Sequence, residues 1–558
     1  MDILFTKDAY KAVQKAGAKS PVFHEEDPWR EVEIESRLIQ KEDLQLIRKV
    51  LQKDQFSQFI ENRRVVRAIE MLEKIEAGDS KEVKIKTLQL FAETARDMIS
   101  KTPHKYLFER HDKLGALLPY FVLSVKYHPP ERYSDAHVSI TMIALHRGDK
   151  KEGPGKNSLS IGRGDLKGGT VMQILDRKGA FIESEALMKE YEDDRARYEK
   201  ISRLTGEQFV ARGTAAFEEA DKEDDKDEYR YSAIPMIRHG DDALIVMDDE
   251  VEMGDDTAHA STTFWTKGKG DDEDGDDEDG KDYEIPVHPV VRVFDLWRHI
   301  FVTIHVSNLT EYPYNPKIVD KIVLPNDHKR LIEALVVGTV RRMDDVVKGK
   351  AAGIIILCKG SPGNGKTLTA EVYGEVAKRP LYTVQCSQLG TDSDTLEKNL
   401  SRALERATRW RAILLIDEAD VYIYERGHDV QQNAIVGVFL RLLEYFNGIL
   451  FMNTNREDVI DDAIESRATA TLVYRNPDHE KAESIWRILL AQYEIQNSDK
   501  LLAPCLKKWP AVSGRNIRQI IRLGKMLADQ EKRPAAISDF EFSARFQNLP
   551  DHVAKAKE

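Results

Sequence analysis

Cysteine is scarce in this sequence. The 558 residues include only Cys358, Cys386 and Cys505, which lie far apart and show neither a CxxC pair nor the Cys/His spacing of a zinc site. Disulfide scaffolds and zinc modules both need more closely spaced ligands. The sequence therefore excludes a disulfide framework and predicts a reducing, cytoplasmic environment.

Long hydrophobic runs are also absent. A membrane-spanning helix needs about 20 consecutive apolar residues. The longest apolar stretches, Ala116 to Val125 and Ala351 to Cys358, are shorter than this, and Pro119 interrupts the first. The N-terminus lacks the basic segment, apolar segment and cleavage site of a secretory signal. We expect no membrane span and no signal peptide, and we interpret both apolar runs as core.

Basic residues are fewer than acidic ones. The sequence has 83 Lys and Arg against 96 Asp and Glu, which gives a net charge of −13. This balance argues against binding nucleic acid chiefly through bulk charge. Two acidic segments, Glu218 to Glu228 and Asp271 to Gly280, concentrate the acidity, and the second is DDEDG written twice. Removing its eight acids from the net charge of −13 leaves −5. We interpret residues 268–283 as an acidic linker, with docking of a basic partner as the alternative.

The N-terminal part of the chain mixes helical and extended patterns. Apolar residues at helical spacing predict helices over 65–75 and 88–98, and β-branched runs predict strands at 138–145 and 243–247. Two further β-rich runs, within 290–306, predict a hairpin. We therefore expect an α+β domain over residues 1–315, in which no motif carries recognisable chemistry.

The first chemical motif follows an apolar run that ends at Cys358. Residues 360–367 read GSPGNGKT and fit the pattern GxxxxGK[ST], with a predicted strand before and a helix after. Such a loop wraps its backbone N–H groups around phosphate at the positive end of the helix. Lys366 is expected to reach the β- and γ-phosphates, and the Thr367 hydroxyl is expected to bind Mg²⁺. The predicted nucleotide-binding residues are Gly360, Ser361, Pro362, Gly363, Asn364, Gly365, Lys366, Thr367 and Leu368.

A second motif lies about fifty residues downstream. The apolar run Ala412 to Ile416 ends in Asp417 and Glu418. In phosphate-loop enzymes, a carboxylate at the end of a neighbouring strand serves the magnesium ion. Asp417 is therefore predicted to serve Mg²⁺, and Glu418 to act as the general base on the attacking water.

Together these motifs resemble the AAA+ ATPases, within them the classical AAA branch, over residues 315–545. The resemblance implies an α/β phosphate-loop core at 316–476 and a helical lid and tail at 477–558. The segment FMNTNRED, from Phe451, resembles the family strand that ends in a water-positioning Asn, which implies Asn455, with Asn453 as the alternative. The segment VIDDAIESR, from Val459, resembles the stretch that ends in the arginine finger, which implies Arg467. A surface ion pair is the alternative for this arginine.

The resemblance extends on both sides of these motifs. The segment SGRNIRQIIR implies a nucleotide-contacting arginine in the lid, for which Arg518 is favoured over Arg515. Asp320 to Leu324 resembles the short strand that precedes the family's first helix.

Two departures from the family pattern limit what the resemblance implies. The segment Leu381 to Gly390 lacks the aromatic of a polypeptide-threading pore loop, although Leu389 is a candidate pore residue. The stretch Glu465-Ser466-Arg467 is closer to the finger of clamp loaders.

These patterns predict an ATP- and Mg²⁺-dependent ATPase that forms a ring, with a hexamer favoured. We expect it to remodel a protein client that the N-terminal domain recruits. Two alternatives stay open, a nucleic-acid-associated loader and an ATP-binding switch or scaffold with little turnover. The negative net charge disfavours the first, and the presence of Glu418 and Arg467 disfavours the second.

Overall fold

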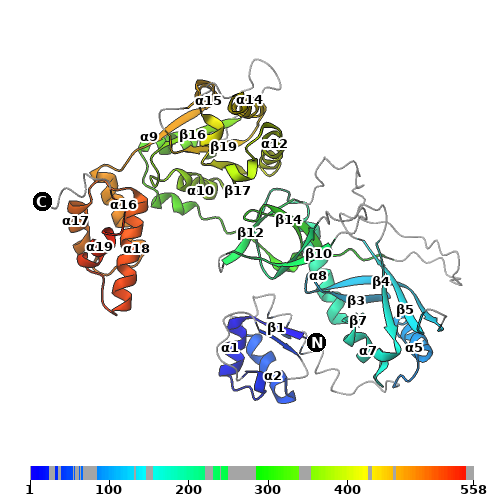
Figure 1. Cartoon of the computed structure of the whole chain (residues 1–558). Helices are drawn as coiled ribbons and strands as arrows, with labels where there is room; N and C mark the ends of the chain where they lie inside the picture. Colours follow the sequence, from blue (N-terminus) through cyan, green and yellow to red (C-terminus); the bar gives the residue numbers. More distant parts are fainter. Residues whose placement is uncertain are drawn as a thin grey trace. The chain divides into compact units, whose positions relative to one another are not determined.

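A computed structural model describes most of the chain (Figure 1). The described residues are 2–23, 32–35, 39–53, 56, 62, 65–66, 69, 84–130, 134–145, 155–219, 230–238, 241–248, 284–337, 353–424, 430–456, 460–547 and 549. The acidic segment Asp271 to Gly280 and the part of the first predicted helix beyond Ile69 lie outside these ranges. Within them, no helix has the length and apolar character needed to cross a membrane.

The chain divides into two units, and the division falls between Thr310 and Glu311. Unit 1 comprises Met1–Leu204 and Phe209–Thr310, and unit 2 comprises Thr205–Gln208 and Glu311–Glu558. The sequence-based boundary at residue 315 lies five residues further along the chain. Each unit has its own buried clusters, and each is described below by itself.

Unit 1 begins with a small α/β element. Strands β1 (Asp2–Phe5) and β2 (Val32–Glu35) pair antiparallel beside helices α1 (Lys7–Lys15) and α2 (Lys41–Leu51). Its polar anchor is the buried Asp43, which accepts hydrogen bonds from the Ser20 hydroxyl and from the backbone amides of Lys19 and Ser20. Burial alone raises the pKa of Asp43, but these hydrogen bonds outweigh burial and hold the pKa below its ordinary value.

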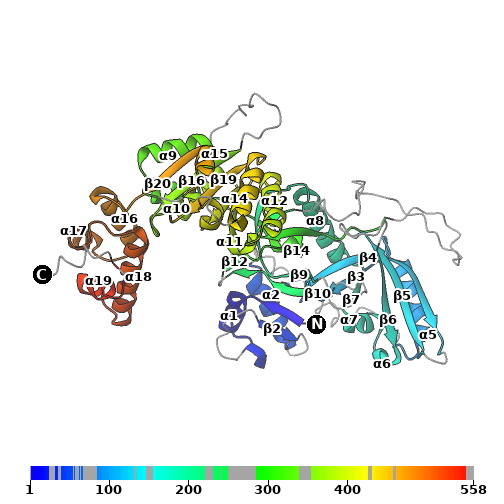
Figure 2. The same ribbon diagram turned by 45° about the horizontal axis from the view of Figure 1, so that its top comes forward.

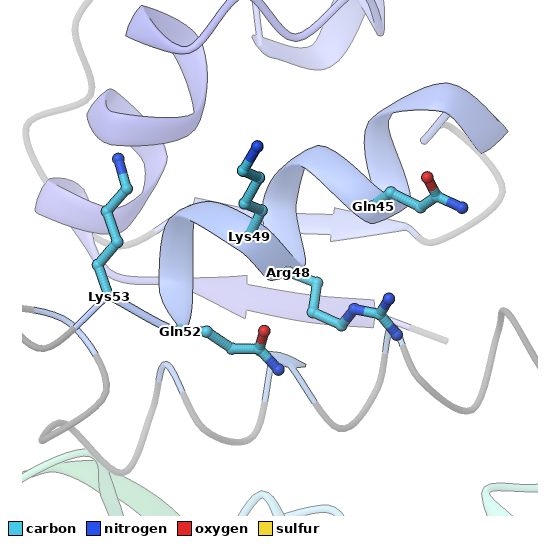
Figure 3. A pocket seen from close by; sticks show the side chains of 5 residues that line it. All are labelled: Gln45, Arg48, Lys49, Gln52 and Lys53. Atoms are coloured by element: carbon cyan, nitrogen blue, oxygen red, sulfur yellow. The ribbon is translucent and has the colours of Figure 1, made fainter.

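A surface hollow of about 410 Å³ is lined by side chains of α2 and of the two residues that follow it (Figure 3). Its lining is polar and basic, which is the composition of a solvated helix face and offers little apolar surface to a small ligand. The lining residues are Gln45, Arg48, Lys49, Gln52 and Lys53.

The next part of unit 1 is a five-stranded antiparallel sheet in the order β6-β5-β4-β3-β7. Helix α5 (Leu88–Ser100), capped by Thr87, buries its apolar stripe against this sheet, as the spacing of Leu88, Phe91 and Ala95 predicts. The other elements are β3 (Tyr106–His111), β4 (Ala116–His128), β5 (His137–Ala144), β6 (Gly155–Gly162), α6 (Arg163–Leu166), α7 (Val171–Arg177) and β7 (Ala180–Ile182).

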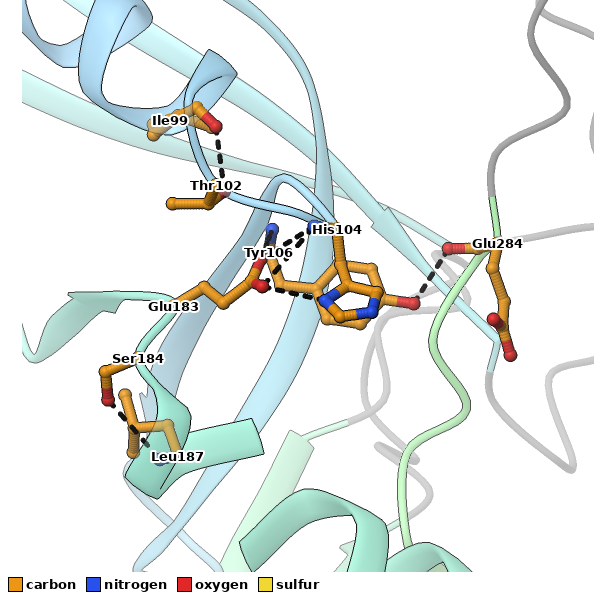
Figure 4. Close-up of polar contacts among 8 residues, drawn as sticks. All are labelled: Ile99, Thr102, His104, Tyr106, Glu183, Ser184, Leu187 and Glu284. Atoms are coloured by element: carbon orange, nitrogen blue, oxygen red, sulfur yellow. Dashed lines mark hydrogen bonds and ion pairs between the residues drawn. The ribbon is translucent and has the colours of Figure 1, made fainter. Parts of the chain in front are cut away.

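A buried carboxylate organises one edge of this sheet (Figure 4). Glu183, whose side chain is 3% exposed, lies 2.7 Å from Nδ1 of His104 and accepts hydrogen bonds from the backbone amides of His104 and Tyr106. The Tyr106 hydroxyl donates to the carbonyl of Glu284 at 2.9 Å, and burial raises the pKa of this tyrosine far above its ordinary value. These contacts attach the segment that follows residue 283 to the start of β3.

The remainder of unit 1 is an eight-stranded sheet in the order β10-β9-β14-β13-β12-β8-β15, with β11 paired to β12. Strands β13 and β14 form an antiparallel hairpin in which Val290 pairs with His305, so the predicted hairpin is confirmed. Helix α8 (Glu185–Ile201) contributes Tyr198 to the same core. The strands are β8 (Gln208–Ala211), β9 (Thr214–Glu219), β10 (Arg230–Pro235), β11 (Ile237–Arg238), β12 (Asp241–Met247), β13 (Val290–Asp295), β14 (Ile300–His305) and β15 (Leu309–Glu311).

Unit 2 opens with a segment that is hydrogen-bonded to a helix of the parallel-sheet core. The Tyr312 hydroxyl donates to Oε1 of Glu375 at 2.6 Å, and the backbone amide of Asn315 donates to Oε2 at 2.7 Å. The η4 turn (Pro316–Lys321) and helix α9 (Asn326–Ile332), with its extension η5 (Glu333–Val337), follow. The expected strand at Asp320 to Leu324 is wrong. Ile322 and Leu324 are buried, but the 3₁₀ turn that starts at Pro316 continues to Lys321 and occupies the first part of this segment, and Pro325 has no N–H to donate to a sheet.

The core of unit 2 is a five-stranded parallel sheet in the order β17-β18-β19-β16-β20. Its strands read as near-continuous apolar runs because both faces of a parallel sheet are covered. The strands and helices are β16 (Ile354–Gly360), α10 (Lys366–Ala377), β17 (Leu381–Gln385), α11 (Cys386–Leu389), α12 (Ser393–Arg409), β18 (Ile413–Asp417), α13 (Asp420–Ile423), α14 (Val430–Glu444), β19 (Ile449–Thr454), α15 (Asp462–Arg467) and β20 (Ala470–Tyr474) (Figure 2).

Helices complete unit 2. Trp486, Trp509 and Phe540 are the largest side chains of their core. Gly524 is required there, because a Cβ at that position would lie 2.4 Å from the Phe540 ring. The predicted helical segment after residue 477 therefore forms a packed helical bundle. Its helices are α16 (His479–Gln492), α17 (Ser498–Lys508), α18 (Gly514–Gln530) and α19 (Ile537–Ala544).

Candidate active site

The phosphate-loop motif lies between β16 and α10, as its sequence predicts. Three of its glycines have left-handed backbones, with φ of 142° at Gly360, 84° at Gly363 and 95° at Gly365. A Cβ at Gly360 would lie 2.0 Å from the carbonyl oxygen of Tyr474, so only glycine fits between β16 and β20. Apart from the two chain neighbours of Gly365, no described residue has an atom within 4 Å of a would-be Cβ there, so the backbone is open to an incoming group.

Lys366 is buried at the start of α10, with 7% of its surface exposed. Its Nζ donates to the carbonyl oxygens of Gly360 at 2.5 Å and Ser361 at 3.1 Å and to Oδ1 of Asn455 at 2.9 Å. Burial lowers the pKa of the Lys366 ammonium, and the Asp417 carboxylate opposes this shift. An ammonium has three N–H donors, so a phosphate oxygen can be bound by exchange with one of these acceptors.

Thr367 and Asp417 meet at the carboxyl edge of the sheet. The Thr367 hydroxyl donates to Oδ2 of Asp417 at 3.0 Å. The amide of Asn453, at the end of β19, donates to Oδ1 of Asp417 at 3.1 Å and to the Thr367 hydroxyl at 3.3 Å. Two neighbouring parallel strands, β18 and β19, and helix α10 therefore direct oxygen and amide groups to a single point.

Glu418 follows Asp417 directly and has a left-handed backbone, with φ of 56°. Its side chain is exposed, and its carbonyl oxygen accepts a hydrogen bond from Sγ of Cys386 at 2.8 Å. Burial and the Asp420 carboxylate raise the pKa of Cys386 to about 11, so this thiol keeps its proton at neutral pH. The left-handed turn thus places an exposed acidic residue directly after Asp417.

Both candidate asparagines lie at the site, in different environments. Asn455 is exposed, contacts Lys366 and donates its backbone amide to Oδ1 of Asp420 at 3.3 Å. Asn453 is 1% exposed and contacts Thr367 and Asp417.

Asp420 was not predicted from the sequence as a site residue. It also accepts a hydrogen bond from the Thr454 hydroxyl, and so links the end of β19 to the segment after β18. Its position in the acidic run Asp417-Glu418-Ala419-Asp420 was the available signal.

Arg467 is the last residue of α15. Its Nη2 lies 3.4 Å from Oε2 of Glu444, and the two side chains are 34% and 31% exposed. A partly exposed pair of this length stabilises the fold weakly, by about 0 to 1 kcal/mol. The guanidinium is therefore accessible at the end of a short helix and can exchange this partner for another anion.

The two lid arginines occupy different positions on α18. The backbone amide of Arg515 donates to the carbonyl of Gly363 at 3.1 Å, and a Cβ at Gly363 would lie 2.7 Å from Cβ of Arg515. Arg518, favoured from the sequence, instead has its Nε 3.3 Å from the Tyr493 hydroxyl within the lid. Arg515 is thus the lid arginine that lies against the phosphate loop.

Two predicted nucleotide-binding residues, Asn364 and Leu368, lie at the margins of the site. Asn364 donates its amide to Oδ1 of Asn476 at 3.1 Å, and Leu368 is 44% exposed on α10.

The suggestion that Leu389 lines a pore is wrong, because Leu389 is 1% exposed and packs inside the fold at the end of α11.

The residues present fit a magnesium nucleotide. The glycine cradle and the helix N-terminus suit phosphate oxygens, and the Thr367 hydroxyl with the Asp417 carboxylate suit a hard cation that keeps several waters. Asn453 adds a buried amide oxygen that has no hydrogen-bond partner among the described residues. In the same ranges, no group of three or more His, Cys, Asp or Glu side chains is arranged to hold a metal ion by itself. This donor set is consistent with a cation whose remaining ligands come from phosphate and water.

Comparison with known proteins agrees with this geometry. Residues 356–475 match the family model of the ATPase family associated with various cellular activities (AAA). The ATP-dependent zinc metalloprotease FtsH of Protochlamydia amoebophila (strain UWE25) is 25% identical over 206 residues, which are 34% of this chain and 22% of that protein. The ATPase family gene 2 protein homolog B of Homo sapiens is 26% identical over 209 residues, which are 35% of this chain and 28% of that protein. The chain thus spans 22% and 28% of the length of these curated relatives.

Solved structures similar to this chain include two with AAA or Trip13 components. A chain of the E. coli MS115-1 HORMA:CdnC:Trip13 complex is 17% identical, with 43% of this chain and 94% of that chain covered and a TM-score of 0.35. The FIGL-1 AAA domain in complex with ADP is 20% identical, with 43% of this chain and 87% of that chain covered and a TM-score of 0.35.

Proposed function

Because residues 356–475 form an AAA+ ATPase module, we propose that this chain binds ATP with Mg²⁺ and hydrolyses it. The observation that carries the proposal is the pairing of the Thr367 hydroxyl with the Asp417 carboxylate at 3.0 Å, directly beside a glycine loop that holds Lys366. This arrangement joins a phosphate cradle to an oxygen site for a divalent cation.

Each residue has a distinct task in the proposed reaction. Lys366 binds phosphate oxygens, and Thr367 with Asp417 holds Mg²⁺, which when bound neutralises charge on the phosphates. Glu418 accepts a proton from the attacking water, a role supported by its exposed carboxylate next to Asp417. Asn455 orients the water or the γ-phosphate, and its contact with Lys366 supports this task.

We further propose that the chain assembles into a ring, with a hexamer favoured, in which Arg467 acts on the nucleotide of a neighbouring subunit. A guanidinium is always charged and can bind phosphate oxygens in a fork. The accessible position of Arg467 and its weak pairing with Glu444 support an exchange of partner in the assembly. Arg515, at the phosphate loop, is our revised candidate for the lid arginine that contacts nucleotide.

The work done with this ATP is proposed to be the remodelling of a protein client. The described part of unit 1 contains three sheets, and its sequence reveals no catalytic motif, which supports a recruiting role. A nucleic-acid-associated function is less well supported, because the chain carries a net charge of −13. The cytoplasmic location stays a prediction from the low cysteine content.

Two substitutions in the full-length chain test the proposed activity. Lys366→Ala should abolish ATP binding in calorimetry, because the phosphate oxygens lose their buried cation. Glu418→Gln should bind ATP normally and lose at least about a hundredfold in phosphate release, because the amide keeps the shape of the carboxylate without its basicity.

The outcomes separate the parts of the proposal. Unchanged ATP affinity in Lys366→Ala would contradict the phosphate-loop assignment. Normal turnover in Glu418→Gln would contradict the role of that carboxylate. A wild-type chain that binds ATP but releases no phosphate would favour the switch or scaffold instead.

A further inference from the structure

Asn453 is a buried amide that follows four apolar residues of strand β19. It follows Phe451 and Met452 in β19, where both neighbours are fully buried, and its own side chain is 1% exposed. Strand β19 pairs with β16 on one side and β18 on the other. Burying an amide without hydrogen bonds costs about 1 to 3 kcal/mol, so the bonds this side chain makes determine whether it is tolerated.

Among the described residues, the Asn453 side chain forms two hydrogen bonds, and both go to the oxygen groups of the cation site. Its Nδ2 lies 3.1 Å from Oδ1 of Asp417 and 3.3 Å from the Thr367 hydroxyl. An amide nitrogen carries two hydrogens, so the two contacts use its full donor capacity. The Thr367 hydroxyl in turn donates to Oδ2 of Asp417. The three side chains therefore form a closed triangle.

This triangle fixes the orientations of the Asp417 carboxylate and the Thr367 hydroxyl, which the hydrogen bond between these two groups alone would leave free. Asn453 and Thr367 bond different oxygens of the Asp417 carboxylate, which restrains rotation about its terminal torsion. The Thr367 hydroxyl hydrogen is directed to Asp417, and one oxygen lone pair accepts from Asn453, so the other lone pair remains for a cation. Residues that orient metal ligands in this way typically contribute 10- to 100-fold to metal affinity.

We propose that Asn453 is a positioning residue that aligns Thr367 and Asp417 for the magnesium ion of bound nucleotide. The proposal rests on the function proposed above and is distinct from the water-positioning role of Asn455. The Asn453 Oδ1 atom supports the positioning role of Asn453, because this buried acceptor has no hydrogen-bond partner among the described residues. A hydrated magnesium ion carries water donors that can satisfy such an acceptor.

Nucleotide binding at controlled magnesium concentration tests this role without turnover. ATPγS affinity of the full-length wild type and of Asn453→Leu is measured by calorimetry in EDTA and across a magnesium titration. Leucine is close in size but removes both donors and the acceptor. In Asn453→Leu, the magnesium concentration that gives half of the affinity gain should rise about tenfold, while the affinity in EDTA stays within about twofold of wild type.

A matched control and a second variant keep the result interpretable. Met452→Leu, at the neighbouring buried position of β19, should leave both the magnesium requirement and the affinity in EDTA unchanged. If Asn453→Leu does not fold, Asn453→Ser takes its place, because serine has one donor and a shorter reach and should show the same rise in magnesium requirement.

The possible results separate this proposal from the one on which it rests. An unchanged magnesium requirement in the folded Asn453→Leu variant would overturn the positioning role. An equal loss of ATPγS affinity with and without magnesium would also overturn it, because that pattern indicates that Asn453 supports the phosphate loop and not the cation site. Failure of the wild type to bind ATPγS under any condition would overturn the proposed function itself, before any variant is compared.

Discussion

Mixing two inactive variants gives the sharpest test of how the active site is assembled. If Arg467 acts on the nucleotide of a neighbouring subunit, the Arg467→Ala subunit retains a complete phosphate loop and Glu418, and the Glu418→Gln subunit retains a complete finger. Each variant alone should be inactive. Loss of an arginine finger lowers turnover by about 10³- to 10⁵-fold.

The structure sets the expected size of the recovery and of the stability change. In a random equal mixture, a site is complete when its loop comes from Arg467→Ala and its finger from Glu418→Gln, which holds for about one quarter of the interfaces of a closed ring. Turnover should therefore recover to about a quarter of wild type. Among the described residues, the Arg467 side chain has the half-buried contact with Glu444 to lose, so in Arg467→Ala the free energy of unfolding should fall by no more than about 1 kcal/mol.

Steady-state phosphate release, measured as a function of mixing ratio, provides the assay. Differently tagged subunits, recovered together, establish that mixed assemblies have formed. Glu444→Gln is the matched control, because it breaks the same ion pair and keeps Arg467, and it should retain wild-type turnover. Verified mixed assemblies that show no recovery at any ratio would refute a finger acting between subunits.

Three further predictions follow from individual contacts. Arg515→Ala should weaken ATP binding about tenfold and Arg518→Ala should not, because α18 brings residue 515 to the phosphate loop and alanine removes its guanidinium while keeping the backbone contact; equal effects in calorimetry would contradict a role of this guanidinium in binding. Tyr312→Phe should lower the free energy of unfolding by about 1 to 3 kcal/mol in denaturant titrations, because its hydroxyl bonds the Glu375 carboxylate; an unchanged midpoint would count against this contact. Asp43→Asn should destabilise the chain at neutral pH. Because the folded pKa of Asp43 is depressed, the wild-type advantage is full above the unfolded pKa of about 4 and should disappear as the pH falls through the folded value; an advantage independent of pH in acid denaturation would refute this linkage.

Several elements of the site follow from short stretches of sequence. The phosphate loop is a contiguous motif whose glycines are demanded by backbone geometry, and Gly360, Gly363 and Gly365 all have the positive φ that only glycine adopts without strain. The apolar runs before Gly360 and Asp417 form the parallel strands predicted for them. The hairpin of unit 1 likewise follows from alternation and a short turn.

Other features depend on contacts that one-dimensional patterns do not encode. The period of a strand places Asn453 and Asn455 on the same side, so the sequence alone could not separate them. Strand β19 ends at Thr454, which keeps Asn453 in the sheet beside Asp417 and leaves Asn455 exposed beside Lys366. The burial of Leu389 was also not predictable, because a single leucine at the end of a short polar segment reads alike in a core and in a pore.

The sequence by itself determined that this chain has a phosphate loop followed by a carboxylate-ended strand, because both are local patterns with strict backbone or burial requirements. Only the tertiary structure decided which side chains meet there. The docking of α18 brings Arg515 rather than Arg518 to Gly363, and the strand order sets Asn453 beside Asp417. These choices depend on the packing of segments between 36 and 152 residues apart, a distance over which residue type and spacing carry no geometric information.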